Sequence, residues 1–146
     1  MSEEKTRIVA RYFAEAVDKR NADILDRFFT RDCVIHRPEA SGPIVGLESY
    51  RKALGRLIDT YSEFTTTIHD LFAAGDRVTC RFSHRAVNRG EWKSRIGRHS
   101  VAGKPVSWSA IAIFRIRDGK IAEEWVCRDE LGMLISLGVL PRASAH

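Results

Sequence analysis

The sequence predicts an α+β fold in which N-terminal helices lie in the concavity of a bent antiparallel sheet. The spacing of apolar residues changes from a period of 3.6 to a period of 2 near residue 62, as expected where helices give way to strands. With 146 residues, 44% hydrophobic and 29% charged, the chain has the composition of a globular domain with an ordinary core. We therefore expect one domain over residues 1–146, shaped as a cone-like half-barrel.

Three helices are expected before the sheet. An amphipathic helix covers residues 3–19, and Asn21 is placed to cap a second, short helix with Leu25 on its apolar face. A short extended piece over residues 33–37 ends at Pro38, and a loop of glycine, serine and proline follows it. The third helix begins at Leu47 and carries a buried apolar stripe.

Alternating patterns then predict a meander of four long strands, over residues 64–73, 78–88, 106–117 and 121–128. The third strand is nearly continuous in apolar and small residues, which favours a strand covered on both faces. Asp118 and Gly119 make a hairpin turn before the last strand. Asp129 is expected to cap a final short helix that stops at Gly138.

A cone of this kind tends to leave an apolar cavity between helices and sheet, where small ligands bind. Trp108 shares a strand face with Ala110 and other small residues, a pattern that fits either a ring-shaped ligand against the indole or plain core packing. Tyr12 and Phe28 are further candidates for the lining of such a cavity.

The formal net charge is +5, and a surplus of Lys and Arg gathers in residues 77–104. No nucleic acid partner is expected, because no reading motif or stacking platform accompanies these charges. The region is interpreted as a solvated hairpin or, alternatively, as a site that attracts an anionic ligand.

Targeting and metal-binding patterns are not expected either. The charged N-terminus does not match a secretory signal, and no segment approaches a membrane span. Three widely separated cysteines fit a reducing, cytoplasmic compartment, and the histidines show no ligand spacing, so no metal site is expected.

Several stretches together are similar to one family. They are IFRIRDGKIAEEW (residues 113–125), DELGMLISLG (129–138), ARYFAEAVDKRNADILDRFF (10–29), CVIHRP (33–38), GLESYRKAL (46–54) and AGKPVSW (102–108). The chain resembles the SnoaL-like polyketide cyclases, or ester cyclases, of the nuclear-transport-factor-two-like superfamily, whose folds include the ketosteroid-isomerase-like cone.

The resemblance implies a cofactor-free acid–base enzyme, usually a homodimer packed through the outer sheet face, that closes a ring by intramolecular aldol condensation. Characterised cyclases carry His-Trp-Asp on the last strand, where this sequence has Glu124, Trp125 and Val126. The glutamine that some cyclases use on the preceding strand falls at Ala110 here. The family's Asp and Gln roles therefore do not transfer to these two positions.

Glu124 is the candidate general base. Residues two apart on a strand share a face, so Glu124, Val126 and Arg128 point the same way, and the resemblance implies that they face the cavity. Desolvation would raise the pKa of Glu124 toward the range useful for a base that must return its proton. The alternative is a structural carboxylate neutralised by Arg128 or Arg81.

His36 is a second candidate, placed by the resemblance at the mouth of the helical layer. There it would orient substrate or carry a proton, or simply hydrogen-bond to backbone at a strand end.

The leading hypothesis is a cofactor-independent enzyme that removes a proton next to a carbonyl of a small hydrophobic compound, followed by cyclisation or isomerisation. The alternatives are a non-catalytic protein that binds a hydrophobic small molecule, and a hydrolase or dehydratase in which Glu124 activates water.

Overall fold

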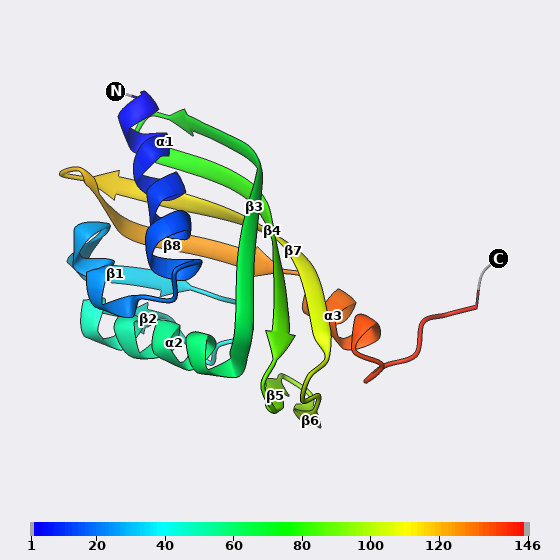
Figure 1. The fold of residues 1–146 in the computed structure, drawn as a ribbon. Coiled ribbons are helices and arrows are strands. Elements are labelled where there is room, and N and C mark those ends of the chain that lie inside the picture. Colours follow the sequence, from blue (N-terminus) through cyan, green and yellow to red (C-terminus); the bar gives the residue numbers. More distant parts are fainter. Residues whose placement is uncertain (1, 145–146) are drawn as a thin grey trace.

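Helices cover the concave side of a strongly bent sheet in the computed structural model, which describes residues 2–144 (Figure 1). The ends of the predicted range, residues 1, 145 and 146, lie outside the described part. The helical elements are α1 (Ser2–Arg11), η1 (Tyr12–Val17), η2 (Ala22–Arg27), α2 (Leu47–Thr60) and α3 (Glu130–Ser136). The strands are β1 (Phe29–His36), β2 (Ile44–Val45), β3 (Tyr61–Ala74), β4 (Arg77–Asn88), β5 (Glu91–Ser94), β6 (Gly97–Ser100), β7 (Pro105–Arg117) and β8 (Lys120–Arg128).

The main sheet is mixed rather than antiparallel throughout. Its strand order is β2-β1-β8-β7-β4-β3, and β1 runs parallel to β8 while the other neighbours are antiparallel. The predicted antiparallel sheet is therefore wrong at this one pairing, because β1 reaches the sheet from the helical layer and joins a strand far along the chain. The sheet is curved and does not close into a barrel.

Strand and helix positions otherwise follow the predictions closely. The four long strands appear at the expected places, and Asn21 and Asp129 cap their helices by accepting hydrogen bonds from the N–H groups of Asp23 and Gly132, at 3.2 and 2.9 Å. The first helix differs: it is α-helical only to Arg11 and continues as the π-helical turn η1. A π-helical turn shifts the facing of side chains within a helix and is common at functional sites.

The two faces of β7 differ in burial. Residues from Val106 to Ile116 alternate between buried and exposed positions, and on the outer face Ile111 is 53% and Ile113 39% exposed. The prediction that this strand is covered on both faces is wrong for the chain as described, because its outer face has no layer of helices over it (Figure 1).

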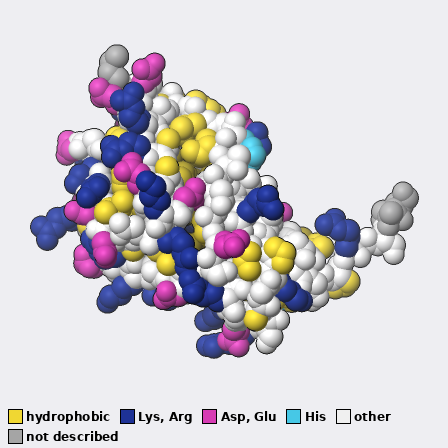
Figure 2. Space-filling view, in the orientation of Figure 1, with side chains coloured by type: hydrophobic (Ala, Val, Ile, Leu, Met, Phe, Trp, Pro, Cys, Tyr) yellow, Lys and Arg dark blue, Asp and Glu magenta, His cyan; other side chains and the backbone are white. Residues whose placement is uncertain are grey.

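The basic region, residues 77–104, forms β4 and the small hairpin of β5 and β6, and it ends just before β7. Trp92 of the hairpin is buried and packs with the core. Arg98 forms an exposed ion pair with Glu91, with 3.1 Å between their charged atoms. Lys and Arg side chains are interspersed with Asp and Glu on the face of the molecule shown in Figure 2. No helix within residues 2–144 has both the length and the apolar character needed to cross a membrane.

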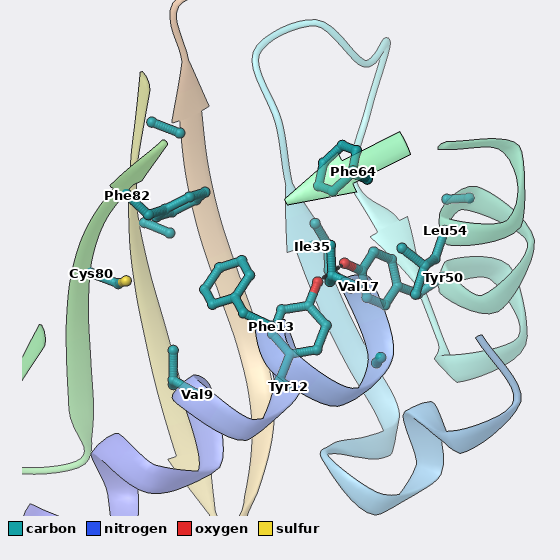
Figure 3. Close-up of a cluster of buried hydrophobic side chains, with 14 of the residues drawn as sticks. Val9, Tyr12, Phe13, Val17, Ile35, Tyr50, Leu54, Phe64, Cys80 and Phe82 are labelled. Carbon is teal, nitrogen blue, oxygen red and sulfur yellow. Dashed lines mark hydrogen bonds between the residues drawn. The ribbon is translucent and has the colours of Figure 1, made fainter. Parts of the chain in front are cut away.

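The core fills the space between the helices and the concave face of the sheet. Aromatic rings from η1, such as Phe13, meet rings from β4 and β7, with 4.7 Å between the centroids of Phe13 and Phe82 (Figure 3). The small hollow that remains among these side chains is where the polar groups described next converge.

Candidate functional site

Glu124 lies on the inner face of β8, between Ile35 of β1 and Phe114 of β7 in the sheet register. Only 4% of the residue is exposed, and its Oε1 has no hydrogen-bond partner within residues 2–144. Buried polar atoms are normally satisfied, so an unpartnered carboxylate oxygen is an unusual feature that requires an explanation. It is a position at which a bound molecule or water would find an acceptor.

Burial raises the pKa of Glu124 to about 7, and the positive charge of Arg37 offsets only part of this effect. The two arginines considered as neutralising partners are engaged elsewhere. Arg128 lies 3.5 Å from a carboxylate oxygen of Glu39, and Arg81 lies 2.6 Å from one of Asp70. The structural alternative for Glu124, an ion pair with Arg128 or Arg81, is therefore not what the structure shows.

Two tyrosine hydroxyls meet in the same region. Tyr12 comes from η1 and Tyr50 from α2, and their hydroxyl groups hydrogen-bond to one another (Figure 3). The guanidinium of Arg37 lies 5.5 Å from the centre of the Tyr50 ring. Burial raises the pKa of both phenols, with the nearby Glu124 acting in the same direction, so both stay protonated at neutral pH.

This tyrosine pair has one hydroxyl proton to spare. When one tyrosine donates to the other, the acceptor's own O–H remains free to donate elsewhere. The pair together with Arg37 thus supplies hydrogen-bond donors and positive charge close to the carboxylate of Glu124.

The cavity itself has a volume of about 70 Å³. It is smaller than the roughly 300–1,000 Å³ of ordinary ligand pockets, so a substrate of more than a few atoms enters only when lining side chains move apart. Phe28 is buried but does not line it. The other predicted inner-face residues do line it, with further side chains from the helices and from β4; the lining includes Tyr12, Phe13, Arg37, Tyr50, Phe64, Phe82, His84, Trp108, Ala110, Glu124, Val126 and Arg128.

His36 lies away from this cavity, on the outer face of the sheet. Its Nε2 is 2.6 Å from Oε2 of Glu123, and its ring stacks on Trp125 with 5.4 Å between centroids. The register explains this placement, because His36 pairs with Trp125 and shares its outward direction. The structure therefore does not bring His36 together with Glu124, and the predicted position at the mouth of the helical layer is wrong.

Three residues at the site were not singled out from the sequence. In the sequence, Tyr50 belongs to the apolar stripe of its helix and Arg37 is the residue before a proline. His84 is one of the alternating residues of a strand. Their convergence depends on pairing between distant segments. A polar-tipped residue on a core-facing stripe, as Tyr50 is, was the one available signal.

Metal ligands do not gather in the described chain. Within residues 2–144 there is no group of three or more His, Cys, Asp or Glu side chains arranged to hold a metal ion.

Known structures share this architecture. TsrD from Streptomyces laurentii is 25% identical with a TM-score of 0.79, over 94% of this chain and 97% of that one. IdmH, a putative polyketide cyclase from Streptomyces antibioticus, is 25% identical with a TM-score of 0.77, over 92% and 98%. An epoxide hydrolase of the LEH-like type from M. tuberculosis has the same fold at 20% identity, with a TM-score of 0.73 and coverage of 94% and 92%.

A search of curated proteins finds no match to this sequence. The sequence model of the SnoaL-like polyketide cyclase family, by contrast, matches residues 7–137, which is most of the chain and includes the helices, the sheet and the site around Glu124. The chain belongs to the SnoaL-like polyketide cyclase family.

Proposed function

We propose that the protein is a cofactor-independent acid–base enzyme that acts on a small hydrophobic carbonyl compound, with Glu124 as the general base. The observation that carries the proposal is the buried Oε1 of Glu124, which has no hydrogen-bond partner within residues 2–144 and faces no neutralising ion pair there. Family membership supports cyclase or isomerase chemistry in general.

The reaction begins with transfer of a proton from the carbon next to the carbonyl to the carboxylate of Glu124. The electron pair of the broken C–H bond forms a C=C double bond to the carbonyl carbon, and the π electrons of the C=O bond move onto the oxygen, which gives an enolate. The spare hydroxyl proton of the pair formed by Tyr12 and Tyr50 is the donor for that oxygen, and Arg37 adds positive charge nearby.

The second half of the reaction returns the proton. In an aldol-type cyclisation the enolate carbon attacks a carbonyl carbon of the same molecule, and Glu124 protonates the alkoxide that forms. In an isomerisation Glu124 returns the proton to a different carbon. A base with a pKa of about 7 serves both steps at neutral pH, because it is strong enough to accept a proton and weak enough to give it back.

Deuterium exchange tests this proposal without knowledge of the natural substrate. In D₂O the protein should catalyse the exchange of deuterium into the position next to the carbonyl of 2-tetralone. Cyclohexanone is a smaller probe that suits the small cavity better. Glu124→Gln should lower that rate by about a hundred- to ten-thousand-fold. Glu123→Gln is the matched control, because Glu123 lies on the opposite face, and it should keep the wild-type rate.

Exchange that is equally fast in Glu124→Gln would refute the role of Glu124. Retention of a bound small molecule in native mass spectrometry, with no exchange of either ketone by the wild type, would instead favour a non-catalytic binding protein.

A second reaction class has one observation in its favour. About 70 Å³ is room for roughly two water molecules beside an unpartnered carboxylate oxygen, the arrangement needed for a Glu-activated water in a hydrolase or dehydratase. Incorporation of ¹⁸O from labelled water into the product of an epoxide or ester probe, lost in Glu124→Gln, would support hydrolysis over enolate chemistry.

We also propose that the protein forms a homodimer through the outer face of its sheet. The exposed Ile111 and Ile113 border a shallow apolar depression with Trp125, and a second copy would remove this surface from water.

A further inference from the structure

His84 lies at the far end of the inner sheet face from Glu124. It projects from β4 opposite Trp108 of β7, whereas Glu124 pairs with Phe114, six residues further along β7. Both side chains line the same cavity. The histidine is 8% exposed and is surrounded by rings, with centroid distances of 4.6 Å to Phe64 and 5.3 Å to Trp108.

A chain of hydrogen bonds runs from His84 into the helical layer. Nδ1 of His84 is 2.9 Å from Oγ1 of Thr66, and that hydroxyl lies 2.6 Å from Oδ1 of Asp18. The backbone N–H of Thr66 also donates to Asp18, to Oδ2 at 3.1 Å. Two donors from one residue therefore converge on the carboxylate of Asp18.

The direction of these bonds determines the tautomer of His84. Thr66 has one hydroxyl proton, and it donates that proton to Oδ1 of Asp18. The oxygen of Thr66 must then accept from His84, which places the ring proton on Nδ1. The lone pair is left on Nε2.

The imidazole also stays uncharged. Burial, together with the positive charges of Arg128 and Arg37, lowers the pKa of His84 to about 3. Within residues 2–144, Nε2 of His84 makes no hydrogen bond. A neutral acceptor among aromatic rings, held in one tautomer by a relay behind it, is prepared for a donor from a ligand.

We propose that Nε2 of His84 accepts a hydrogen bond from a hydroxyl or N–H group of the substrate, at the end of the cavity remote from Glu124. The substrate class would then be a cyclic or aromatic carbonyl compound that carries a donor, such as a phenolic hydroxyl, distant from the carbon that loses its proton. Thr66 and Asp18 are positioning residues in this scheme. The proposal rests on the proposed function for the location of the reacting carbon.

The test compares 6-hydroxy-2-tetralone with 6-methoxy-2-tetralone, which has a similar shape but no donor. The wild type should bind the hydroxyl compound about 2- to 10-fold more tightly by calorimetry, the range expected for one net hydrogen bond. His84→Phe should lose this preference because it keeps a ring but removes the acceptor. The matched control is His69→Phe, since His69 is exposed and bonds to Ser83. Equal affinities in the wild type, or no binding of either compound, would overturn the proposal.

A second readout requires no ligand. In ¹⁵N NMR spectra of the free protein, Nε2 of His84 should show the shift of an unprotonated ring nitrogen and Nδ1 that of a protonated one. Thr66→Val should mix the tautomers and weaken the hydroxyl preference, whereas Thr66→Ser should restore both. A protonated Nε2 in the wild type would contradict the proposal.

Failure of this proposal is distinguishable from failure of the proposed function. Glu124→Gln should retain the preference for the hydroxyl compound while it loses deuterium exchange. A wild type that exchanges deuterium but shows no preference would leave the role of Glu124 in place and remove that of His84.

Discussion

Glu123 and Glu124 are neighbours in sequence but face opposite sides of the same sheet, and their surroundings differ sharply. On the outer face, Glu123 lies 2.6 Å from His36 and 3.2 Å from Arg115, and its pKa is lowered, mainly by the hydrogen bond from His36. On the inner face, the pKa of Glu124 is raised to about 7 by burial.

The difference shows how one strand places a carboxylate that forms ion pairs on one face and a buried carboxylate on the other. Both residues have the same side chain, and the pleat of β8 turns Glu123 to the outer face, beside His36 and Arg115, and Glu124 into the buried cavity. Glu123 is therefore part of a network of ion pairs on the outer face. Oε1 of Glu124 has no hydrogen-bond partner among residues 2–144, and its proposed role as a base rests on that feature.

After Glu124→Gln itself, the largest effect should come from the donors that accompany the inner carboxylate. Replacing both tyrosines of the pair, Tyr12→Phe with Tyr50→Phe, should slow deuterium exchange of 2-tetralone by about a hundred- to a thousand-fold, as for the loss of an oxyanion donor. Tyr61→Phe is the control, because Tyr61 is buried but does not line the cavity. An unchanged rate in the double variant would mean that the enolate oxygen binds elsewhere.

The two glutamates should also differ in how they affect stability with pH. The folded pKa of Glu124 lies above its unfolded value near 4.5, so wild-type stability declines as pH rises from about 4.5 through about 7. Glu124→Gln lacks this penalty and should be more stable than the wild type above pH 7, by about 3 kcal/mol. Near pH 4 the two proteins should be alike.

Glu123→Gln should show the opposite sign and a smaller size. The pKa of Glu123 is lowered in the folded protein, so its contribution is present above its unfolded pKa and is lost as pH falls through the folded one. Because the pair is partly exposed, the loss at pH 7 should be below about 1 kcal/mol. Urea unfolding at pH 4, 6 and 8 measures both variants, and parallel curves would contradict the contrast between the two faces.

The smallest effect on the fold should come from the outer face itself. Ile111→Asp should convert a dimer into a monomer in sedimentation experiments while the unfolding midpoint measured by circular dichroism changes little. The control is Ser109→Asp, because Ser109 is exposed on the same face as Ile111. Thr79→Asp would not serve as a control, because Thr79 is half-buried. A wild type that sediments as a monomer at all concentrations would exclude the proposed dimer.

Local patterns were sufficient to predict most of the helices and strands, whereas the direction in which the last strand faces the cavity came from the family resemblance. Alternation along β8 predicted that Glu124 and Val126 share a face, and the caps at Asn21 and Asp129 are short-range hydrogen bonds that sequence can indicate. The parallel pairing of β1 with β8 could not be predicted in this way, because nothing within β1 specifies a partner some 90 residues away.

The residues of the candidate site also divide into those that the sequence indicated and those whose position depends on pairing between distant segments. Strand periodicity together with the family resemblance pointed to Glu124, Trp108 and Arg128. The position of His36 was mistaken because its facing depends on the register of β1 against β8. Tyr50 and His84 reach the cavity only through contacts between segments far apart in the chain.

The titration of Glu124 tests the central claim most directly. In ¹³C NMR spectra of protein labelled at glutamate side-chain carboxyls, with Glu124→Gln used for assignment, the Glu124 signal should titrate with a pKa of about 7, while Glu123 titrates below its usual range. A Glu124 pKa at or below the ordinary value near 4.5 would show that the carboxylate is solvated or paired, and would contradict its assignment as the base of this site.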